Sequence, residues 1–367
     1  MWAPVLLLFL LASSGAFAAG PESGLYLPVW GVKLTDPQGL LYLPEERAVP
    51  AVSPDYQVAY CGSSSGKMRA YDFYTGIELW FYDTGGAVIA SEPLVEGSVV
   101  FFGTSQGTMI ALNRFSGRLL WKYQATAIIN AKPAFENGRL FFQTRQNQVV
   151  ALDASTGKWL WHYQREAPES FTVVETDGPV VRNATIYAGF TDGSAAALNA
   201  NDGSVIWQKK LAKGSQFTDI TGSPAFFGDR ICFPSYTAGI SCLDPATGRV
   251  LWTAQVQGGN TPLATSDGNL LVTTGRGEIT LLDGEGRTIY GYRLSGAVFS
   301  GPRGSGFGGY AAFTNAYGSV YVVDTSTLKI AQTVRPGKGV SAVPLTTPRS
   351  LMILTNTGWL YKFSHKD

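Results

Sequence analysis

The sequence predicts an all-β protein: an eight-bladed β-propeller of four-stranded antiparallel blades, with the ring closed by the N-terminal strand. Three observations predict it. An Asp/Asn–Gly–Trp pattern recurs every 39 to 46 residues, a proline recurs in register with that pattern, and 43 glycines and 13% aromatic residues indicate many short strands with tight turns. A period of about 40 residues with four short strands per unit is typical of propeller blades.

The repeat is easiest to follow from a marker, the Asp or Asn of segments such as "ALDASTGKWLW" (151–161). The markers are Asp72, Asn113, Asp153, Asn199, Asp244, Asp283 and Asp324, with Ser364 in a degenerate eighth unit. Four residues later comes a turn glycine in five units: Gly76, Gly117, Gly157, Gly203 and Gly248. Eight residues after the marker comes Trp80, Trp121, Trp161, Trp207 or Trp252. The sixth unit is one residue short, with Gly286 and Tyr290, and the seventh has Leu328 and Gln332 instead.

The repeated residues have structural explanations. A proline lies 20 to 22 residues before each of the eight markers, as at Pro93 and Pro133, which suits an innermost strand with a free edge. The Asp accepts hydrogen bonds from nearby backbone in a turn, and the Gly takes a positive φ there. The Trp covers the joint between neighbouring blades. The pattern therefore indicates structure rather than a catalytic site.

The eighth unit ends after "GWLYKFS" (358–364), before a fourth strand. The segment "LPVWGVKL" (27–34) offers an apolar run with a Trp, so we expect Trp30 to occupy the eighth Trp position. Closing the ring in this way removes an open seam. It also predicts that residues 20–367 form a single domain.

The N-terminus has the features of a secretory signal. The apolar stretch "VLLLFLLA" (5–12) precedes Ala16-Phe17-Ala18, a suitable cleavage site, which predicts a signal peptide over residues 1–19. An uncleaved anchor is the alternative. The net charge of +1 and the absence of a block of like charges argue against nucleic-acid binding. We expect an exported, monomeric protein.

Three cysteines are too few for a disulfide framework. Cys232 and Cys242 flank the turn "SYTAG" (235–239) and should lie on adjacent strands. A three- or five-residue loop would place them opposite each other, close enough to bond, whereas a two- or four-residue loop would place them on different faces. No cluster of His and Cys has metal-ligand spacing, and neither a metal nor a cofactor is expected.

The repeat resembles that of pyrroloquinoline-quinone (PQQ)-type propellers, on segments such as "GTMIALNRFSGRLLW" (107–121) and "GSAAALNANDGSVIW" (193–207). Within that group the chain is most similar to the BamB-type periplasmic propellers of the outer-membrane β-barrel assembly machinery. That resemblance implies a periplasmic protein peripheral to the outer membrane, with the assembly core protein's periplasmic domains as partner. The lipid-attachment Cys of that family has no counterpart, and Val174 and Thr221 stand where the family has an Arg and an acidic residue.

Connector lengths point to the same surface. A long connector runs from Trp30 to Pro50 and contains "LPEER" (43–47). Elsewhere the interval from the Trp position to the next proline is 10 to 13 residues in most units, but 18 after Trp161 and 17 after Trp207. These two connectors match the family's partner-binding segments and contain an expected patch of apolar and acidic residues: Phe171, Val173, Glu175, Asp177, Phe217, Asp219 and Ile220. Exposed apolar residues surrounded by charge suit a protein partner. The alternative is that these loops only lie over the channel mouth.

The sequence thus predicts a non-enzymatic scaffold that assists outer-membrane β-barrel assembly, and such a scaffold could also hold unfolded outer-membrane proteins by strand pairing. One alternative is a quinoprotein-like oxidoreductase that uses PQQ. The chain has no adjacent pair of cysteines of the kind that those enzymes use. A second alternative is an exported propeller that binds another protein or a glycan.

Overall fold

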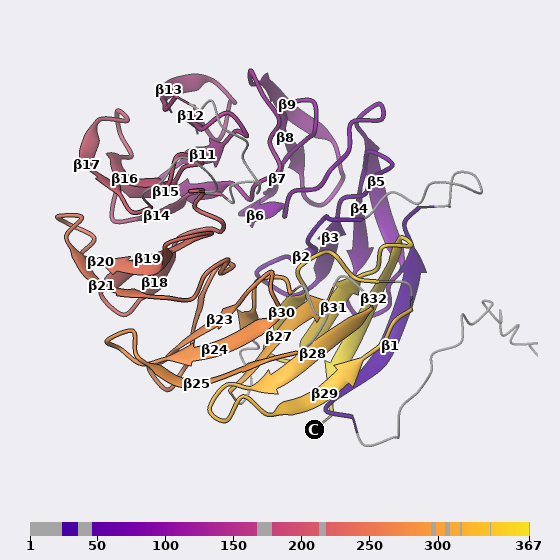
Figure 1. Cartoon of the computed structure of the whole chain (residues 1–367). Coiled ribbons are helices and arrows are strands. Elements are labelled where there is room, and N and C mark those ends of the chain that lie inside the picture. The colour runs from indigo at the N-terminus through magenta and orange to yellow at the C-terminus, as the bar shows by residue number, and fades with distance from the viewer. Residues whose placement is uncertain are drawn as a thin grey trace, which may run out of the picture.

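The computed structural model describes residues 24–35, 46–166, 178–212, 218–294, 299–304, 309–315, 318–337 and 339–366. These residues form eight four-stranded antiparallel sheets arranged around a ring, which confirms the predicted eight-bladed propeller (Figure 1). We number the blades by the order of their inner strands along the chain. No helix able to cross a bilayer occurs in the described part of the chain.

Blades 1 to 7 run outward from the central channel in sequence order, whereas the outermost strand of blade 8 comes from the N-terminal side of the chain. The innermost strands are β2 (Ala51–Val52), β6 (Leu94–Glu96), β10 (Ala134–Glu136), β14 (Val180–Arg182), β18 (Ala225–Phe227), β22 (Leu263–Ala264), β26 (Arg303–Gly304) and β30 (Leu345–Thr347). The second strands are β3 (Val58–Cys61), β7 (Val99–Gly103), β11 (Arg139–Gln143), β15 (Thr185–Gly189), β19 (Arg230–Ser235), β23 (Leu270–Thr273), β27 (Tyr310–Asn315) and β31 (Ser350–Leu354). Each repeated proline lies one residue before an innermost strand, where its missing N–H costs no ladder hydrogen bond.

The outer half of each blade carries the marker turn. The third strands are β4 (Lys67–Asp72), β8 (Thr108–Asn113), β12 (Gln148–Asp153), β16 (Ser194–Asn199), β20 (Gly239–Leu243), β24 (Glu278–Leu282), β28 (Ser319–Asp324) and β32 (Trp359–His365). The outermost strands are β5 (Glu78–Asp83), β9 (Leu119–Gln124), β13 (Trp159–Gln164), β17 (Val205–Lys210), β21 (Val250–Ala254), β25 (Thr288–Arg293), β29 (Ile330–Val334) and β1 (Tyr26–Lys33).

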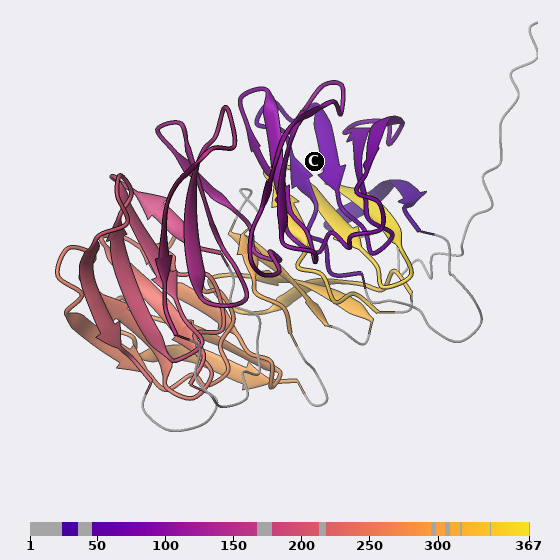
Figure 2. The ribbon, with the colours of Figure 1, turned by 90° about the horizontal axis from the view of Figure 1, so that it is seen from above.

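The N-terminal strand completes the eighth blade, as predicted. Its sheet has the order β1-β32-β31-β30, and β1 pairs antiparallel with β32. The indigo start of the chain and its yellow end lie side by side in both views (Figures 1 and 2). Trp30 Nε1 donates to the carbonyl oxygen of Phe73 at 3.1 Å, which places this Trp at the joint between blades 8 and 1. The Lys362 ammonium also donates to that carbonyl, at 2.9 Å.

The core consists of apolar clusters between neighbouring blades, for example one that contains Phe101, Trp121 and Phe142 from blades 2 and 3. The blade tryptophans belong to these joints, as predicted. The indole N–H of Trp121 donates to the Ala154 carbonyl of the next blade at 3.0 Å, and that of Trp161 donates to the Ala200 carbonyl at 3.2 Å. Each joint thus combines apolar burial with one satisfied polar group.

The marker turns have the predicted chemistry. Asp153 Oδ1 accepts hydrogen bonds from the backbone and the hydroxyl groups of Ser155 and Thr156, at 2.7 to 3.1 Å. Gly157 has φ +71°, and a Cβ at this position would lie 2.5 Å from a ring carbon of Trp121. Glycine is therefore required twice, for the backbone conformation and for the close approach of the ring.

Two joints depart from the repeat. In the sixth blade Tyr290 occupies the Trp position but is exposed, and Tyr292 makes the cross-joint hydrogen bond, from its hydroxyl to the Leu328 carbonyl at 2.9 Å. In the seventh blade Gln332 holds the backbone of Tyr26 in β1 at both ends: it accepts from its N–H at 2.7 Å and donates to its carbonyl at 2.9 Å. Blade 7 therefore has a glutamine in place of the repeated Trp at its joint with β1, the strand that closes the ring.

Candidate functional site

The candidate site is the face of the ring that carries the blade-to-blade connectors, which we call the connector face. Three of its connectors are long, and two of these are adjacent: they join blade 3 to blade 4 and blade 4 to blade 5, whereas the third joins blade 8 to blade 1. Five of the predicted partner-binding residues, Phe171, Val173, Glu175, Asp177 and Phe217, lie outside the described residues. The described chain next to these connectors defines how they are anchored.

An ion pair joins blades 3 and 4 beside both connectors. Arg165, which follows β13, donates from Nε and Nη2 to Asp192 Oδ2 at 2.6 Å. Asp192 lies in the turn between β15 and β16, and Ser194 donates to it from its backbone and its hydroxyl at 2.9 and 3.0 Å. Arg165 also donates to the Ser194 hydroxyl at 3.1 Å. A fork of donors on one carboxylate gives this contact a fixed geometry.

The two groups affect each other's protonation. Burial alone raises the pKa of Asp192, but hydrogen bonds from Arg165 and Ser194 outweigh burial and hold that pKa below its ordinary value. Burial lowers the pKa of Arg165, while the hydrogen bond and the charge of Asp192 raise it by more. Both side chains are therefore charged at neutral pH.

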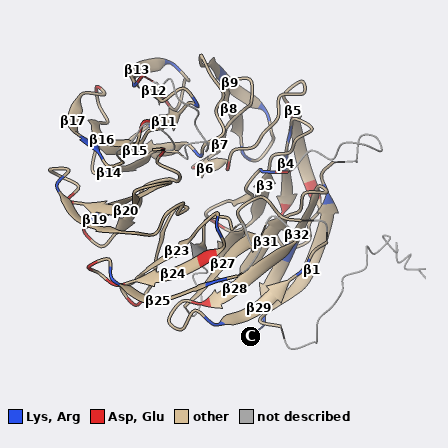
Figure 3. Ribbon diagram, viewed as in Figure 1, with Lys and Arg blue, Asp and Glu red and all other residues tan. Residues whose placement is uncertain are grey.

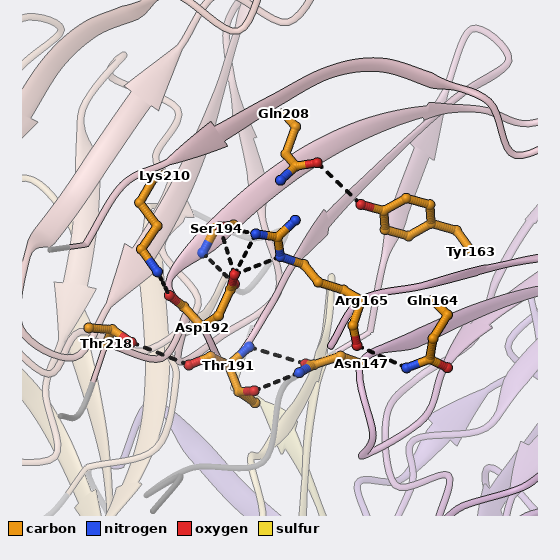
Figure 4. Close-up of polar contacts among 10 residues, drawn as sticks. All are labelled: Asn147, Tyr163, Gln164, Arg165, Thr191, Asp192, Ser194, Gln208, Lys210 and Thr218. Carbon is orange, nitrogen blue, oxygen red and sulfur yellow. Dashed lines mark hydrogen bonds and ion pairs between the residues drawn. The ribbon is translucent and has the colours of Figure 1, made fainter. Parts of the chain in front are cut away.

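Further polar contacts extend this pair into a network (Figure 4). Lys210, at the end of β17, donates its ammonium to the Asp192 carbonyl. Asn147 and Thr191 exchange two hydrogen bonds across the joint, at 2.7 and 3.1 Å. Thr218, just after the second connector, contacts the Thr191 carbonyl at 3.5 Å. We call Asn147, Arg165, Thr191, Asp192, Ser194 and Lys210 the blade 3–4 clamp.

Asp219 and Ile220 are described, and both side chains are about 1% exposed. The expectation that they contribute to an exposed patch is wrong for the isolated chain. After the connector the backbone re-enters the ring: Ile220 N–H donates to the Phe190 carbonyl, and the Asp219 carbonyl accepts from Tyr236 N–H at 3.0 Å. A repeat signal identifies Ile220 as core, because Ile89 and Ile129 also lie four residues before a blade proline and are also buried.

Cys232 and Cys242 lie in blade 5, the blade that the second connector enters. They are directly opposite on β19 and β20, with Cα atoms 4.0 Å apart, and form a disulfide. The intervening loop has three residues, 236–238, which is one of the two lengths that allow the bond. Cys61 is a buried free thiol in β3. The disulfide fixes the hairpin whose tip, Tyr236, holds Asp219.

The centre of the ring holds a cavity of about 790 Å³. Lys132 of blade 3 forms an ion pair with Glu92 of blade 2 in its lining. The lining also contains Arg47 and Asn130, together with small or apolar residues such as Val49 and Gly178. The described residues contain no group of three or more His, Cys, Asp or Glu side chains placed to hold a metal ion, and Cys232 and Cys242 lie in blade 5 and do not line the cavity.

Charge is distributed without a dominant sign. Lys, Arg, Asp and Glu side chains are scattered around the ring and gather at turns and strand ends (Figure 3). With a net charge of +1 this distribution offers no extended basic surface for a phosphate backbone. The fold and the site define the class: an eight-bladed propeller of PQQ-type repeats with two long loops from adjacent blades on one face.

Comparison with known proteins identifies the family within that class. A family model described as outer membrane protein assembly factor BamB matches residues 64–290 and 237–338. The chain belongs to this family.

Curated relatives carry the same name. The Shewanella oneidensis protein is 24% identical over 200 residues, which is 53% of this chain and 40% of that protein. The Burkholderia pseudomallei protein is 24% identical over 322 residues, 83% of this chain and 81% of that one. The alignments cover 40% of the Shewanella protein and 54% of a relative from Nitrosomonas eutropha, so that the chain spans about half the length of these two proteins.

Solved structures show the same fold. BamB from Moraxella catarrhalis superimposes with a TM-score of 0.79 at 19% identity and covers 92% of this chain and 99% of that one. A europium-containing methanol dehydrogenase superimposes with a TM-score of 0.75 at 12% identity over 92% of this chain and 93% of that one. These similarities concern the propeller architecture alone.

Proposed function

We propose that the protein is a non-enzymatic periplasmic scaffold that assists the assembly and insertion of outer-membrane β-barrel proteins. Family membership supports this role, because the matching family model and the curated relatives are described as outer membrane protein assembly factors. The partner that we propose is the core protein of the assembly machinery, bound through its periplasmic domains. Unfolded outer-membrane proteins are a second class of partner. The predicted signal peptide over residues 1–19 would deliver the chain to the periplasm, peripheral to the outer membrane.

The blade 3–4 clamp supports the proposal that the partner binds at the two connectors next to it. A partner-binding loop needs a fixed base, because ordering a loop on binding costs free energy. The first of these connectors leaves the ring at Arg165, which contacts Asp192 of the next blade. The second leaves after Lys210 and returns at Thr218, which contact the carbonyls of Asp192 and Thr191. Phe171 and Phe217 are the aromatic residues of these connectors that the sequence predicts to be exposed. In this proposal they form the centre of the contact.

Co-purification tests this surface. The double substitution Phe171→Ala and Phe217→Ala should reduce recovery of the assembly complex with the tagged protein at least tenfold, because apolar anchors dominate most interfaces. Asp219 is left unchanged, since its burial makes a folding defect the expected result of replacing it. Unchanged recovery of the complex would refute the docking surface.

The clamp gives a second test. Arg165→Ala should reduce recovery to a lesser extent, about threefold to tenfold, because it loosens the connector bases and removes no apolar anchor. Arg118→Ala is the matched control: Arg118 is an exposed arginine in the marker turn of blade 2, on the opposite face. Equal losses for the two variants would indicate a general charge effect and contradict the role of the clamp.

A further inference from the structure

The outermost strand of blade 1, β5, differs from the corresponding strands of blades 2 to 7. Every second residue from Ile77 to Phe81 is apolar and at least half exposed: Ile77 64%, Leu79 50% and Phe81 53%. Tyr74, in the turn that precedes the strand, is 56% exposed. We call these four residues the blade 1 edge.

The repeat shows that this is a departure. At the position of Ile77 the next six blades have charged or hydroxyl residues: Arg118, Lys158, Ser204, Arg249, Arg287 and Lys329. At the position of Phe81, one residue after the Trp position, they have Lys122, His162, Gln208, Thr253, Gly291 and Thr333. Charged and polar residues on an outer strand prevent pairing with another chain. Blade 1 lacks this protection at both positions. Blade 8 has Leu27 and Gly31 there, but Leu27 is only 38% exposed and the glycine offers no apolar side chain.

The backbone of β5 is available for pairing. The strand is last in the sheet order β2-β3-β4-β5, and no described strand pairs with its outer side. Lys67 and Arg69 of the neighbouring β4 lie near the ring of Phe81, with their cationic groups 5.2 and 5.5 Å from its centroid. Arg69 also forms an ion pair with Glu78. The result is an apolar strip with a charged border, beside a free strand edge.

The area of the apolar strip indicates which kind of binding partner fits it. Four side chains exposed to this degree present roughly 400 Å² of apolar area. A stable interface between two folded proteins needs about 800 Å² on each partner, which makes a second copy of this chain a poor match. A single extended strand matches in size, in its need for backbone partners and in its alternation of side chains.

We infer that the blade 1 edge binds an extended peptide with apolar residues at alternate positions, which adds to β5 as a fifth strand. Strands that cross a membrane as part of a barrel have this alternation over about 10 residues. The inference is independent of the docking surface on blades 3 and 4, because the two surfaces involve different blades. It adds a binding site for unfolded substrate to the proposed scaffold.

A labelled peptide tests the inference with the whole mature protein. The probe is a synthetic ten-residue peptide of alternating valine and threonine, and its control carries two central prolines, which remove backbone donors. Fluorescence anisotropy should show binding of the first peptide and none of the second. Hydrogen exchange should show new protection of backbone amides in 78–83 when the first peptide is present.

Substitution gives the decisive comparison. Ile77→Lys with Phe81→Lys introduces the protection that other blades have, and should weaken peptide binding at least tenfold. Leu251→Lys with Thr253→Lys adds the same charge to β21 of blade 5 and should change binding less than twofold. Equal weakening by both pairs, protection of a different outer strand, or absence of peptide binding would each overturn the inference.

Two further outcomes identify a different occupant. Dimer formation of the unliganded protein in light scattering, abolished by the blade 1 pair, would show that a second copy covers the edge. Binding to phosphatidylglycerol vesicles that the blade 1 pair abolishes would show a membrane contact instead. Either result overturns the peptide inference. Recovery of the assembly complex should be unchanged in the blade 1 pair, so that a failure here is distinguishable from a failure of the proposed docking surface.

Discussion

At the scale of single residues, each repeat depends on a few side chains whose hydrogen bonds are set by the geometry of the marker turn. Asp153 shows this most clearly: hydrogen bonds from the hydroxyls of Ser155 and Thr156 hold its pKa below the ordinary value of 3.8. Because the folded-state pKa is the lower one, the carboxylate stabilises the fold fully above the ordinary pKa. This contribution is lost as the pH falls through 3.8 toward the folded-state value.

Asp153→Asn tests this dependence. At pH 7 the substitution should lower the free energy of unfolding by about 0.5 kcal/mol, since a neutral amide accepts weaker hydrogen bonds and the site is partly exposed. Near pH 3 the difference from the unsubstituted protein should shrink, because Asp153 itself is then becoming protonated. Urea unfolding at both pH values measures it. A difference that is constant with pH would contradict the assignment.

Gly157 gives a second residue-scale prediction. Gly157→Ala should cost about 3 kcal/mol, because the new Cβ meets the Trp121 ring at 2.5 Å in addition to the strain of φ +71°. Gly138→Ala is the matched control, with φ +76° and no atom within 4 Å of the new Cβ. It should cost about 1 kcal/mol, the backbone term alone. Equal costs in thermal unfolding would show that the Trp contact is unimportant.

At the scale of elements, sequence periodicity predicted the blades and their joints, and failed where contacts do not repeat. The glycine and Trp positions, including Trp30 in the closing strand, follow from spacing because each blade solves the same packing problem. The contact of Arg165 with Asp192 occurs at a single joint, so no second instance could reveal it. The burial of Asp219 was missed because a long connector was taken to be exposed along its whole length.

Gln332 is a joint residue of this non-repeating kind. Gln332→Leu should lower the free energy of unfolding by about 1–3 kcal/mol, because it leaves the N–H and carbonyl of Tyr26 without that partner. Gln332→Glu keeps the acceptor for the N–H and loses the donor to the carbonyl, and should cost less than the Leu variant. If Gln332→Leu were as stable as the unsubstituted chain, the pairing of β1 with β32 alone would hold the closing strand.

At the scale of the whole molecule, stability depends on closure. Blade 8 takes its outer strand from the N-terminus, and the joint between blades 8 and 1 buries residues from both ends of the chain, including Leu34, Phe73 and Leu360. Opening this joint would expose the edge of β32 and the apolar faces of two blades. Such an edge is a template for association with other chains.

Removal of residues 24–35 from the mature protein tests closure. The shortened chain should unfold at a markedly lower urea concentration and self-associate in size-exclusion chromatography with light scattering. A synthetic peptide of residues 24–35 added in trans should restore the monomer and part of the stability, because β1 binds through a ladder and a defined joint. A stable monomer without these residues would contradict the importance of closure.

Closure also sets a temporal order for folding. The strand β1 precedes blades 1 to 7 in the sequence, yet its partner β32 follows them, and Tyr26 and Gln332 are 306 residues apart. Blades 1 to 7 can form in sequence from local hairpins as they emerge, whereas β1 has to wait without its partner until β32 has been made. Pairing of β1 with β32 therefore follows formation of the other blades, and a molecule in which it has not yet occurred has an open strand edge.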